Sequence, residues 1–194
     1  MCGFLFIKTK TNQLDQLKVG KLFKTFSWRG PDNSTSLIIN NRVFLGHHRL
    51  AIQDPTPASN QPMVSHCGRY YLLFNGEIYN HHDLRKKHSL KCELSSDTAT
   101  LLAGLVFFGQ PFVKELEGMF AFVFFDSYTN EWFSARDQLG VKPLYYHTSN
   151  QFDVVCSEAS IIGKFTDSSI DQDSVIEWHG FRRPFPGFTF FHNV

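Results

Sequence analysis

The chain has 194 residues, of which 42% are hydrophobic and 15% aromatic, so it is long and apolar enough to bury the core of one domain. Its 19 basic and 18 acidic residues leave a formal charge of +1, whereas disordered chains carry a large net charge and few aromatic residues. This balance gives no electrostatic reason to expect a nucleic acid or a membrane surface as partner. The longest apolar runs also fall well short of the about 20 residues that span a membrane.

The four cysteines form no CxxC pair, so their spacing predicts neither a zinc site nor a thioredoxin-like motif. The first residues do not form a secretory signal, since a basic region and a longer apolar stretch are missing. We therefore expect a cytoplasmic protein with reduced thiols, in which Cys67, Cys92 and Cys156 are small packing residues.

Cys2 differs from the other cysteines because of its position. If Met1 is removed, the Cys2 thiol lies beside a free α-amine with a pKa of about 7.7–8.0. That amine can accept the thiol proton directly or through one water, so a single residue supplies both nucleophile and base. If Met1 stays, the amine is one residue too far away and this base is lost. The alternative is that a cysteine at position two has no catalytic role.

Hydrophobic periodicity predicts the first elements of the chain. A compact apolar run predicts a buried strand at 3–8, which places Cys2 at its mouth. Leucines and phenylalanines at helical spacing predict a helix at 13–27. The segment 36–45 is typical of a hairpin around Asn40-Asn41.

The middle of the chain combines a proline-rich loop at 53–62 with a predicted strand at 70–74. A helix is predicted at 96–108, with Ser95 or Ser96 as its N-cap. Four predicted strands then form one antiparallel meander, at 120–126, 131–136, 144–147 and 152–157. We expect a mixed α and β fold in which helices cover sheets.

Asn75-Gly76 directly follows the strand predicted at 70–74 and has two interpretations. Asn-Gly is the strongest short signal for a hairpin turn. Alternatively, the Asn75 amide and the Gly76 backbone N–H form an oxyanion hole, and glycine lets a substrate carbonyl approach the backbone closely. The local sequence leaves both interpretations open.

Two charged residues are candidates for substrate binding. The guanidinium of Arg49, where a strand meets a loop, can hold a carboxylate in two parallel hydrogen bonds or form a surface ion pair. Asp97 can interact with the positive end of a helix dipole or hold a substrate ammonium. The adjacent histidines at 47–48 and 81–82 are expected to point to opposite faces of a strand, so we expect no metal site.

Two further motifs combine an Arg/Asp pair with a glycine turn. They are Arg29-Gly30-Pro31-Asp32 and Arg136-Asp137-Gln138-Leu139-Gly140. Such pairs suit a buried or half-buried polar network. We therefore expect them to be architectural rather than catalytic.

Taken in order, the motifs of the chain resemble one family. They are Met-Cys-Gly (1–3), Arg-Gly-Pro-Asp (29–32), Gly-His-His-Arg-Leu-Ala-Ile (46–52), Asn-Gln-Pro-Met (60–63), Phe-Asn-Gly-Glu-Ile-Tyr-Asn (74–80), Ser-Asp-Thr (96–98), Leu-Glu-Gly-Met-Phe-Ala-Phe (116–122), Arg-Asp-Gln-Leu-Gly-Val-Lys-Pro-Leu-Tyr-Tyr (136–146) and Ser-Glu (157–158). Over nearly the whole chain, the series closely resembles the class II glutamine amidotransferase domain at the amino end of glutamine-dependent asparagine synthetases.

The resemblance implies an α+β fold of the N-terminal-nucleophile hydrolase type, a four-layer αββα sandwich of two antiparallel sheets. It implies hydrolysis of L-glutamine to L-glutamate and ammonia, without a metal or cofactor. By position, Cys2 matches the nucleophile, and Asn75 and Gly76 match the oxyanion hole. The substrate-binding residues that it implies are Arg49 for the α-carboxylate, Glu77 and Asp97 for the α-ammonium, and Leu50, Ala51, Ile52 and Gln53 as backbone lining of the same pocket.

The chain departs from the family pattern at three places. Ala99 stands where the family usually has Glu, which removes half of a capping box and predicts a looser helix start at Asp97. Phe4-Leu5-Phe6 replaces the usual Ile-Phe-Gly and adds bulk, and Trp28 stands where a His is common. These departures concern efficiency and partner rather than the chemistry.

The resemblance divides the chain into a glutaminase domain at 1–163 and a phenylalanine-rich connector at 164–194. In the family an ATP- and Mg-using synthetase domain follows, and its Ser-Gly-Gly-x-Asp-Ser loop does not occur in these residues. The expected partner is therefore a synthetase, fused or separate, that makes asparagine. The alternatives are a non-catalytic glutamine-binding or regulatory module, or an amidotransferase with a different acceptor. Five phenylalanines at 181–191 predict that the connector packs on this domain or on the partner.

Overall fold

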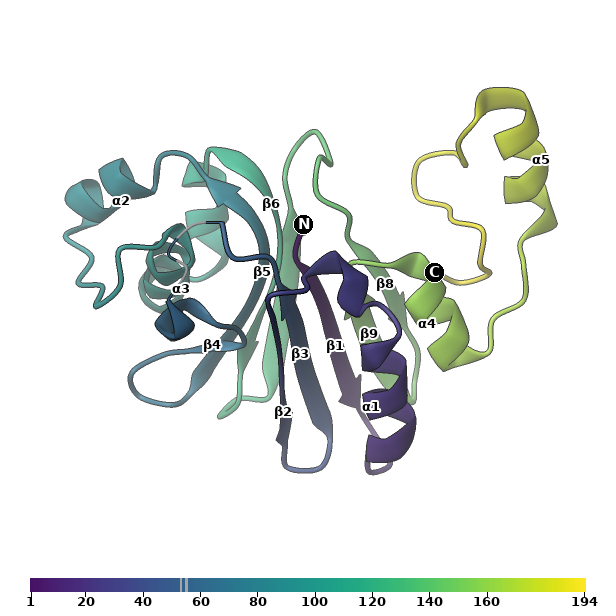
Figure 1. Cartoon of the computed structure of the whole chain (residues 1–194), viewed down its shortest axis with the longest axis horizontal. Coiled ribbons are helices and arrows are strands. Elements are labelled where there is room, and N and C mark those ends of the chain that lie inside the picture. Colours follow the sequence, from purple (N-terminus) through teal and green to yellow (C-terminus); the bar gives the residue numbers. More distant parts are fainter. Residues whose placement is uncertain (53, 55) are drawn as a thin grey trace.

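The computed structural model describes residues 1–52, 54 and 56–194, and its strands form two antiparallel sheets (Figure 1). The first sheet has five strands, in the order β2 (Asn33–Ile39), β3 (Val43–Arg49), β1 (Gly3–Thr9), β9 (Phe152–Cys156) and β8 (Tyr145–Thr148). The second has four strands, in the order β4 (Met63–Val64), β5 (Tyr70–Ile78), β6 (Gly118–Asp126) and β7 (Glu131–Arg136).

Helices cover the outer faces of both sheets. The first sheet packs against α1 (Gln16–Lys24) and α4 (Ala159–Thr166), and the second against α2 (His81–His88) and α3 (Asp97–Phe108). A third apolar cluster fills the space between the two sheets. The predicted four-layer αββα sandwich is therefore confirmed. Short 3₁₀ turns lie at Ser27–Arg29, Pro57–Ser59 and Gln110–Glu115.

β1 is apolar on both faces because each face is buried against a different layer. Phe4 and Phe6 lie in the core between the sheets, whereas Leu5 and Ile7 face α1 and α4. A strand buried on both faces requires a continuous apolar run. The bulk of Phe6 is accommodated in the inter-sheet core, where its ring centroid lies 5.2 Å from that of Trp132.

Several predicted elements are confirmed. The predicted hairpin is β2–β3, and Asn40 and Asn41 turn its chain with φ of 50° and 54°. The helix at 97–108 begins after Ser96, whose hydroxyl accepts the backbone N–H of Ala99 at 3.3 Å. The helix predicted at 13–27 is shorter, because a 3₁₀ turn follows α1. Trp28, in that turn, is 67% exposed.

The predicted single meander is wrong. β6 and β7 form a hairpin in the second sheet, whereas β8 and β9 form a hairpin at the edge of the first sheet. The segment between β7 and β8 carries the chain from one layer to the other. Alternation within each strand is the same in both arrangements, so the local pattern did not distinguish them.

Asn75-Gly76 is not a hairpin turn either, because β5 continues through it to Ile78 and pairs with β6 along its whole length.

The motif at 136–140 holds the connection between β7 and β8, as predicted for an architectural motif. The Asp137 carboxylate accepts backbone N–H groups of Val141 at 2.8 Å and Lys142 at 3.0 Å.

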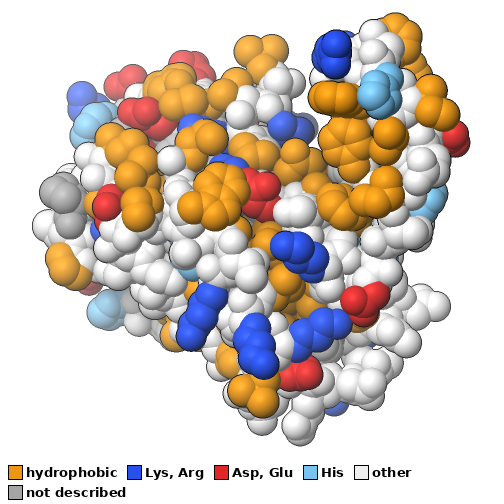
Figure 2. All heavy atoms as spheres, turned by 45° about the vertical axis from the view of Figure 1, so that its right-hand side comes forward, with side chains coloured by type: hydrophobic (Ala, Val, Ile, Leu, Met, Phe, Trp, Pro, Cys, Tyr) orange, Lys and Arg blue, Asp and Glu red, His pale blue; other side chains and the backbone are white. Residues whose placement is uncertain are grey.

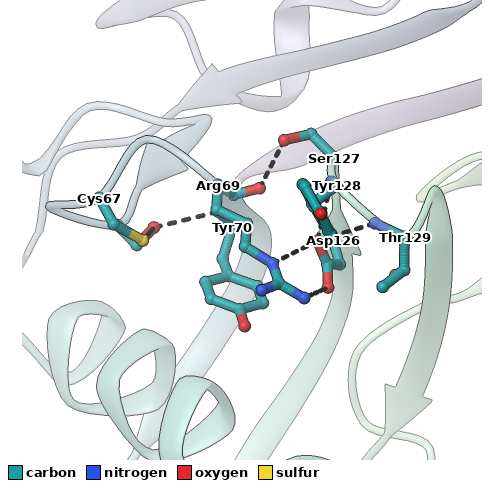
Figure 3. A network of polar contacts seen from close by, with 8 residues as sticks. Cys67, Arg69, Tyr70, Asp126, Ser127, Tyr128 and Thr129 are labelled. Atoms are coloured by element: carbon teal, nitrogen blue, oxygen red, sulfur yellow. Dashed lines mark hydrogen bonds and ion pairs between the residues drawn. The ribbon is translucent and has the colours of Figure 1, made fainter.

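At the start of β5, Arg69 joins this strand to the end of β6 (Figure 3). Its Nε and Nη2 donate to the two carboxylate oxygens of Asp126, at 2.8 Å and 2.5 Å. The hydrogen bond from Arg69 holds the pKa of Asp126 well below its usual range.

Cys67, near Arg69, is exposed, so the prediction that it is a packing residue is wrong. Cys156 is fully buried, as expected for a packing residue.

The connector forms α5 (Gln172–Phe181) and a return segment that docks on α4 (Figure 1). Phe191 lies against Gly163 and bridges to Ile170, whereas Phe181, Phe185 and Phe188 are exposed. Figure 2 shows hydrophobic side chains gathered on this part of the surface. Packing on this domain is thus confirmed for part of the connector. Among the described residues, no helix combines the length and apolar character needed to cross a membrane.

Candidate active site

The alternation of β1, β3 and β5 brings the predicted site residues to one end of the sandwich. Alternate side chains of all three strands fill the core between the sheets. Because every second side chain of a strand points to the same face, this layer continues with Cys2, Arg49 and Asn75. The register that pairs Gly3 with His48 sets Cys2 opposite Arg49.

These side chains border a cavity of about 300 Å³, at the lower end of the about 300–1,000 Å³ found for ligand pockets. Eight of the predicted site residues line it, namely Cys2, Arg49, Leu50, Ile52, Asn75, Gly76, Glu77 and Asp97. Ala51 is not among the lining residues, and its backbone N–H donates to the Asp32 carboxylate at 2.8 Å. Gln53 lies outside the described residues.

Cys2 is held at the mouth of β1 from two sides. Its thiol sulfur accepts the backbone N–H of Leu50 at 3.4 Å, and its carbonyl accepts Nε of Arg29 at 3.0 Å. Arg29 is 5% exposed and also donates to Glu158 at 2.5 Å. The predicted architectural role of this arginine is therefore confirmed, and its network fixes the backbone of Cys2.

Gly76 directs its backbone N–H toward the cavity edge of β5. It lies opposite Phe120 of β6, whose own N–H and carbonyl bond to Asp137 on the far side. In an antiparallel pair this means that the Gly76 N–H and carbonyl also point away from β6. A Cβ at Gly76 would lie 2.4 Å from the Met119 carbonyl. Glycine is thus required here by the close approach of β6.

Asn75 is 2% exposed, and its amide nitrogen has no hydrogen-bond partner among the described residues. Leaving a buried donor unpaired is costly unless something else accepts from it. Since Asn75 lines the cavity, this donor is available to a group bound there.

Two side chains fix the peptide that precedes Asn75. Gln61 accepts the Phe74 N–H at 2.6 Å and donates to the Phe74 carbonyl at 3.1 Å. His47 Nε2 donates to the same carbonyl at 3.0 Å. Burial lowers the pKa of His47 to about 4, so its ring is neutral near pH 7.

Arg49 is 5% exposed and anchors the loop that follows β3. Its Nη1 donates to the Thr56 carbonyl and to Oδ1 of Asn60, both at 2.9 Å, and its Nη2 donates to the Asp54 carbonyl. The guanidinium therefore shapes the wall of the cavity as well as carrying a positive charge to it. The surface ion pair considered from the sequence does not describe this buried residue.

Asp97, at the start of α3, brings a carboxylate to the same cavity. Its Oδ2 accepts the backbone N–H of Ile78 at 3.0 Å, and its Oδ1 accepts that of Thr98 at 2.7 Å. The side chain is 4% exposed, and this burial raises its pKa. Glu77 adds a second carboxylate from β5.

Several residues of the cavity were not predicted from the sequence. They are Met1, Ser59, Gln61, Phe74, Ser96, Thr98, Met119 and Lys142. Most of them stand inside the motifs quoted above, next to residues that were predicted. The signal was present, but no rule of local sequence says which members of a motif face a cavity.

The two histidine pairs differ in geometry. His47 and His48 reach opposite faces of β3, where they bond to Phe74 and Phe23. His81 and His82 lie in a helix with ring centroids 4.0 Å apart, so the strand argument does not apply to them. No group of three metal-ligating side chains occurs within the described part of the chain.

The two-sheet sandwich also occurs in a solved structure. The glutamine phosphoribosylpyrophosphate amidotransferase of Bacillus subtilis aligns with 83% of this chain and 43% of its own, with a TM-score of 0.67 and 19% identity. The fold is therefore that of the N-terminal-nucleophile hydrolases. A family model described as glutamine amidotransferase domain matches residues 1–194, so the chain belongs to this family.

Curated relatives place the chain among the domains of the asparagine synthetase type. A putative glutamine-hydrolysing asparagine synthetase 2 of Methanocaldococcus jannaschii is 34% identical over 170 residues, which cover 78% of this chain and 33% of that protein. Asparagine synthetase 3 of Bacillus subtilis is 39% identical over 153 residues, 75% of this chain and 25% of that protein. Asparagine synthetase 1 of the same organism is 32% identical over 94% of this chain and 30% of its own. The chain thus spans about a third or less of these relatives.

Proposed function

We propose that this chain hydrolyses L-glutamine to L-glutamate and ammonia, with Cys2 as nucleophile. One observation carries the proposal: the unpaired Asn75 amide and the outward Gly76 N–H border the same cavity as the Cys2 thiol. Two donors beside a nucleophile are what a tetrahedral oxyanion requires.

Charge in the cavity suits a zwitterionic amino acid. Arg49 brings a guanidinium to one wall, and Glu77 and Asp97 bring carboxylates from β5 and α3. A guanidinium holds an α-carboxylate and carboxylates hold an α-ammonium. In this binding mode the side-chain amide of glutamine extends toward Cys2.

The reaction balances with the groups of this chain and water. Once Met1 is removed, the α-amine of Cys2 takes the thiol proton, and the thiolate attacks the amide carbon of glutamine. The resulting oxyanion accepts hydrogen bonds from Asn75 and Gly76. The carbon–nitrogen bond breaks as the amine returns its proton, so ammonia leaves. Water then hydrolyses the thioester, which releases glutamate and restores the thiol.

We place the ammonia acceptor outside this chain. The relatives of similar sequence are asparagine synthetases, and this chain covers a quarter to a third of their length. We infer that ammonia passes to an ATP- and Mg-using synthetase domain or subunit, most simply one that forms asparagine. The glutaminase step itself uses no cofactor. The competing function is a glutamine-binding module without turnover.

Ammonia release from L-glutamine by the purified chain tests the proposal, with Cys2→Ala as control. We expect release by the wild-type chain and none by Cys2→Ala, which should still bind glutamine because the charged walls are intact. The intact mass determines whether Met1 has been removed. A chain that lacks Met1 and binds glutamine without releasing ammonia would support the binding module instead.

A further inference from the structure

Arg85 of α2 forms hydrogen bonds to the start of α3 and to the segment that precedes it. Its Nη2 donates to the carbonyls of Leu94 and Ser96, both at 2.7 Å, and its Nε donates to the Thr100 hydroxyl at 2.6 Å. The Arg85 side chain is half-buried and does not line the cavity. It therefore acts on the site through its neighbours.

The Ser96 carbonyl belongs to the peptide that joins Ser96 to Asp97. Three donors reach this oxygen, and the Arg85 bond of 2.7 Å is shorter than the two bonds of 3.3 Å from the backbone and hydroxyl of Thr100. Because a charged donor gives the stronger hydrogen bond, Arg85 dominates the position of this peptide.

The N-terminal cap of α3 lacks the second hydrogen bond of a capping box. Ser96 accepts the Ala99 N–H, but Ala99 has no side-chain oxygen to accept the N–H of Ser96 in return. The helix nevertheless begins at Asp97, where the loss of a capping box predicted a looser start. The guanidinium of Arg85 instead restrains the carbonyl of the same residue, Ser96, from outside the helix.

We propose that Arg85 is a positioning residue for the amino-acid pocket, because it fixes the Ser96–Asp97 peptide and so directs the Asp97 carboxylate into the cavity. This inference rests on the proposed glutamine site. Lysine cannot replace it fully, since an ammonium lacks the planar fork that bonds to three oxygens in fixed directions.

The test measures the Kd of L-glutamine in the Cys2→Ala background, and kcat and KM in the Cys2 chain, for Arg85→Ala and Arg85→Lys. We expect Arg85→Ala to raise Kd and KM roughly tenfold with kcat changed far less, and Arg85→Lys to recover part of this loss. Arg69→Ala is the matched control. Arg69 is also half-buried and bonds to an acceptor pair, but it lies at the other end of β5.

Arg69→Ala should lower the Tm and leave Kd unchanged. The proposal is overturned if Arg85→Ala and Arg85→Lys lower the Tm as Arg69→Ala does and leave the Kd of glutamine at its wild-type value. If Arg85→Ala does not fold, the same comparison is made with Arg85→Lys alone.

Amide hydrogen exchange separates this inference from the proposed function. The N–H groups of Ile78 and Thr98 bond to the Asp97 carboxylate, so they report its position without any ligand. Should the wild-type chain bind no glutamine, the proposed function fails. Faster exchange of these two amides in Arg85→Ala, and not in Arg69→Ala, would still sustain the positioning of Asp97, whereas unchanged exchange would overturn it.

Discussion

Arg49 shows how one side chain serves both the shape and the charge of the cavity. Two of its nitrogens are bonded to Asp54, Thr56 and Asn60, and Arg49 lines the same cavity as Asp97. Removing it therefore has two separable consequences, a displaced loop and a lost positive charge. A variant of Asn60 distinguishes them, because it disturbs the loop bond and leaves the charge.

Arg49→Ala should raise the KM for glutamine by about tenfold or more and lower kcat much less, because a carboxylate clamp binds ground state and transition state alike. Steady-state ammonia release gives both constants. Asn60→Ala removes one partner of Arg49 and should raise KM only slightly. Equal increases in the two variants would mean that Arg49 acts through the loop rather than through the substrate carboxylate.

His47 makes the stability of the fold depend on pH in a defined window. Burial lowers its pKa from 6.5 to about 4 in the folded chain. Between these values the unfolded chain binds a proton that the folded chain does not, so stability falls as pH drops, by up to about 1.4 kcal/mol per pH unit.

His47→Gln should remove this contribution, because glutamine keeps an N–H for the Phe74 carbonyl but does not titrate. Urea unfolding of both chains between neutral pH and pH about 4 measures the effect. We expect the wild-type free energy of unfolding to fall more steeply than that of the variant. Parallel curves would contradict the neutral, buried state assigned to His47.

At the scale of elements, sequence patterns predicted turns and helix caps correctly but not which strands pair with each other. The β2–β3 hairpin and the cap of α3 follow from Asn40-Asn41 and from Ser96, whose effects extend over a few residues. The sheet to which β8–β9 belongs is decided by packing against β1, which no local signal encodes. For the same reason Asn75-Gly76, a strong turn signal, continues a strand once β6 pairs with it.

The pairing of β5 with β6 depends on Gly76. A Cβ there would lie 2.4 Å from the Met119 carbonyl and 2.7 Å from the Phe120 Cα, so one backbone must move. Gly76→Ala should destabilise the fold by at least roughly 1–3 kcal/mol and abolish ammonia release, because the strand edge that carries Asn75 shifts.

Gly20→Ala is the control for this substitution. Gly20 lies within α1, and no described atom beyond its chain neighbours and its own helix backbone comes within 4 Å of an added Cβ, so alanine should stabilise the chain by about 0.5–1 kcal/mol. Chemical denaturation compares both variants with the wild type. A Gly76→Ala chain of wild-type stability would show that β6 can retreat from β5 at little cost.

Across the whole molecule, the connector beyond α4 contacts the sandwich mainly through its last residues. The sandwich is held by one cluster between the sheets and one beneath the helices on each side. Beyond α4, the connector folds back through the bridge between Ile170 and Phe191 and through the Phe191 ring against Gly163. The Asn193 carbonyl also accepts Nδ1 of His147 at 2.7 Å, and Val194 packs on the cluster beneath α1 and α4. The division at 163–164 and the synthetase contact stay predictions, and exposed Phe188 at 62% is a candidate for that contact.

We therefore expect substitutions of Phe191 and Phe188 to have opposite effects on the attachment of the connector: one releases it and the other does not. Phe191 fills the space that Gly163 leaves open, so Phe191→Ala should release the return segment. Phe188→Ala should not, because exposed side chains usually change stability by less than about 0.5 kcal/mol. Hydrogen exchange of the Asp171 and His192 amides, which bond to Phe190 and Ser169, measures the attachment directly. Both amides should exchange faster in Phe191→Ala alone; equal rates in the two variants would mean that the other contacts of the return segment, and not the Phe191 ring, hold the connector on α4.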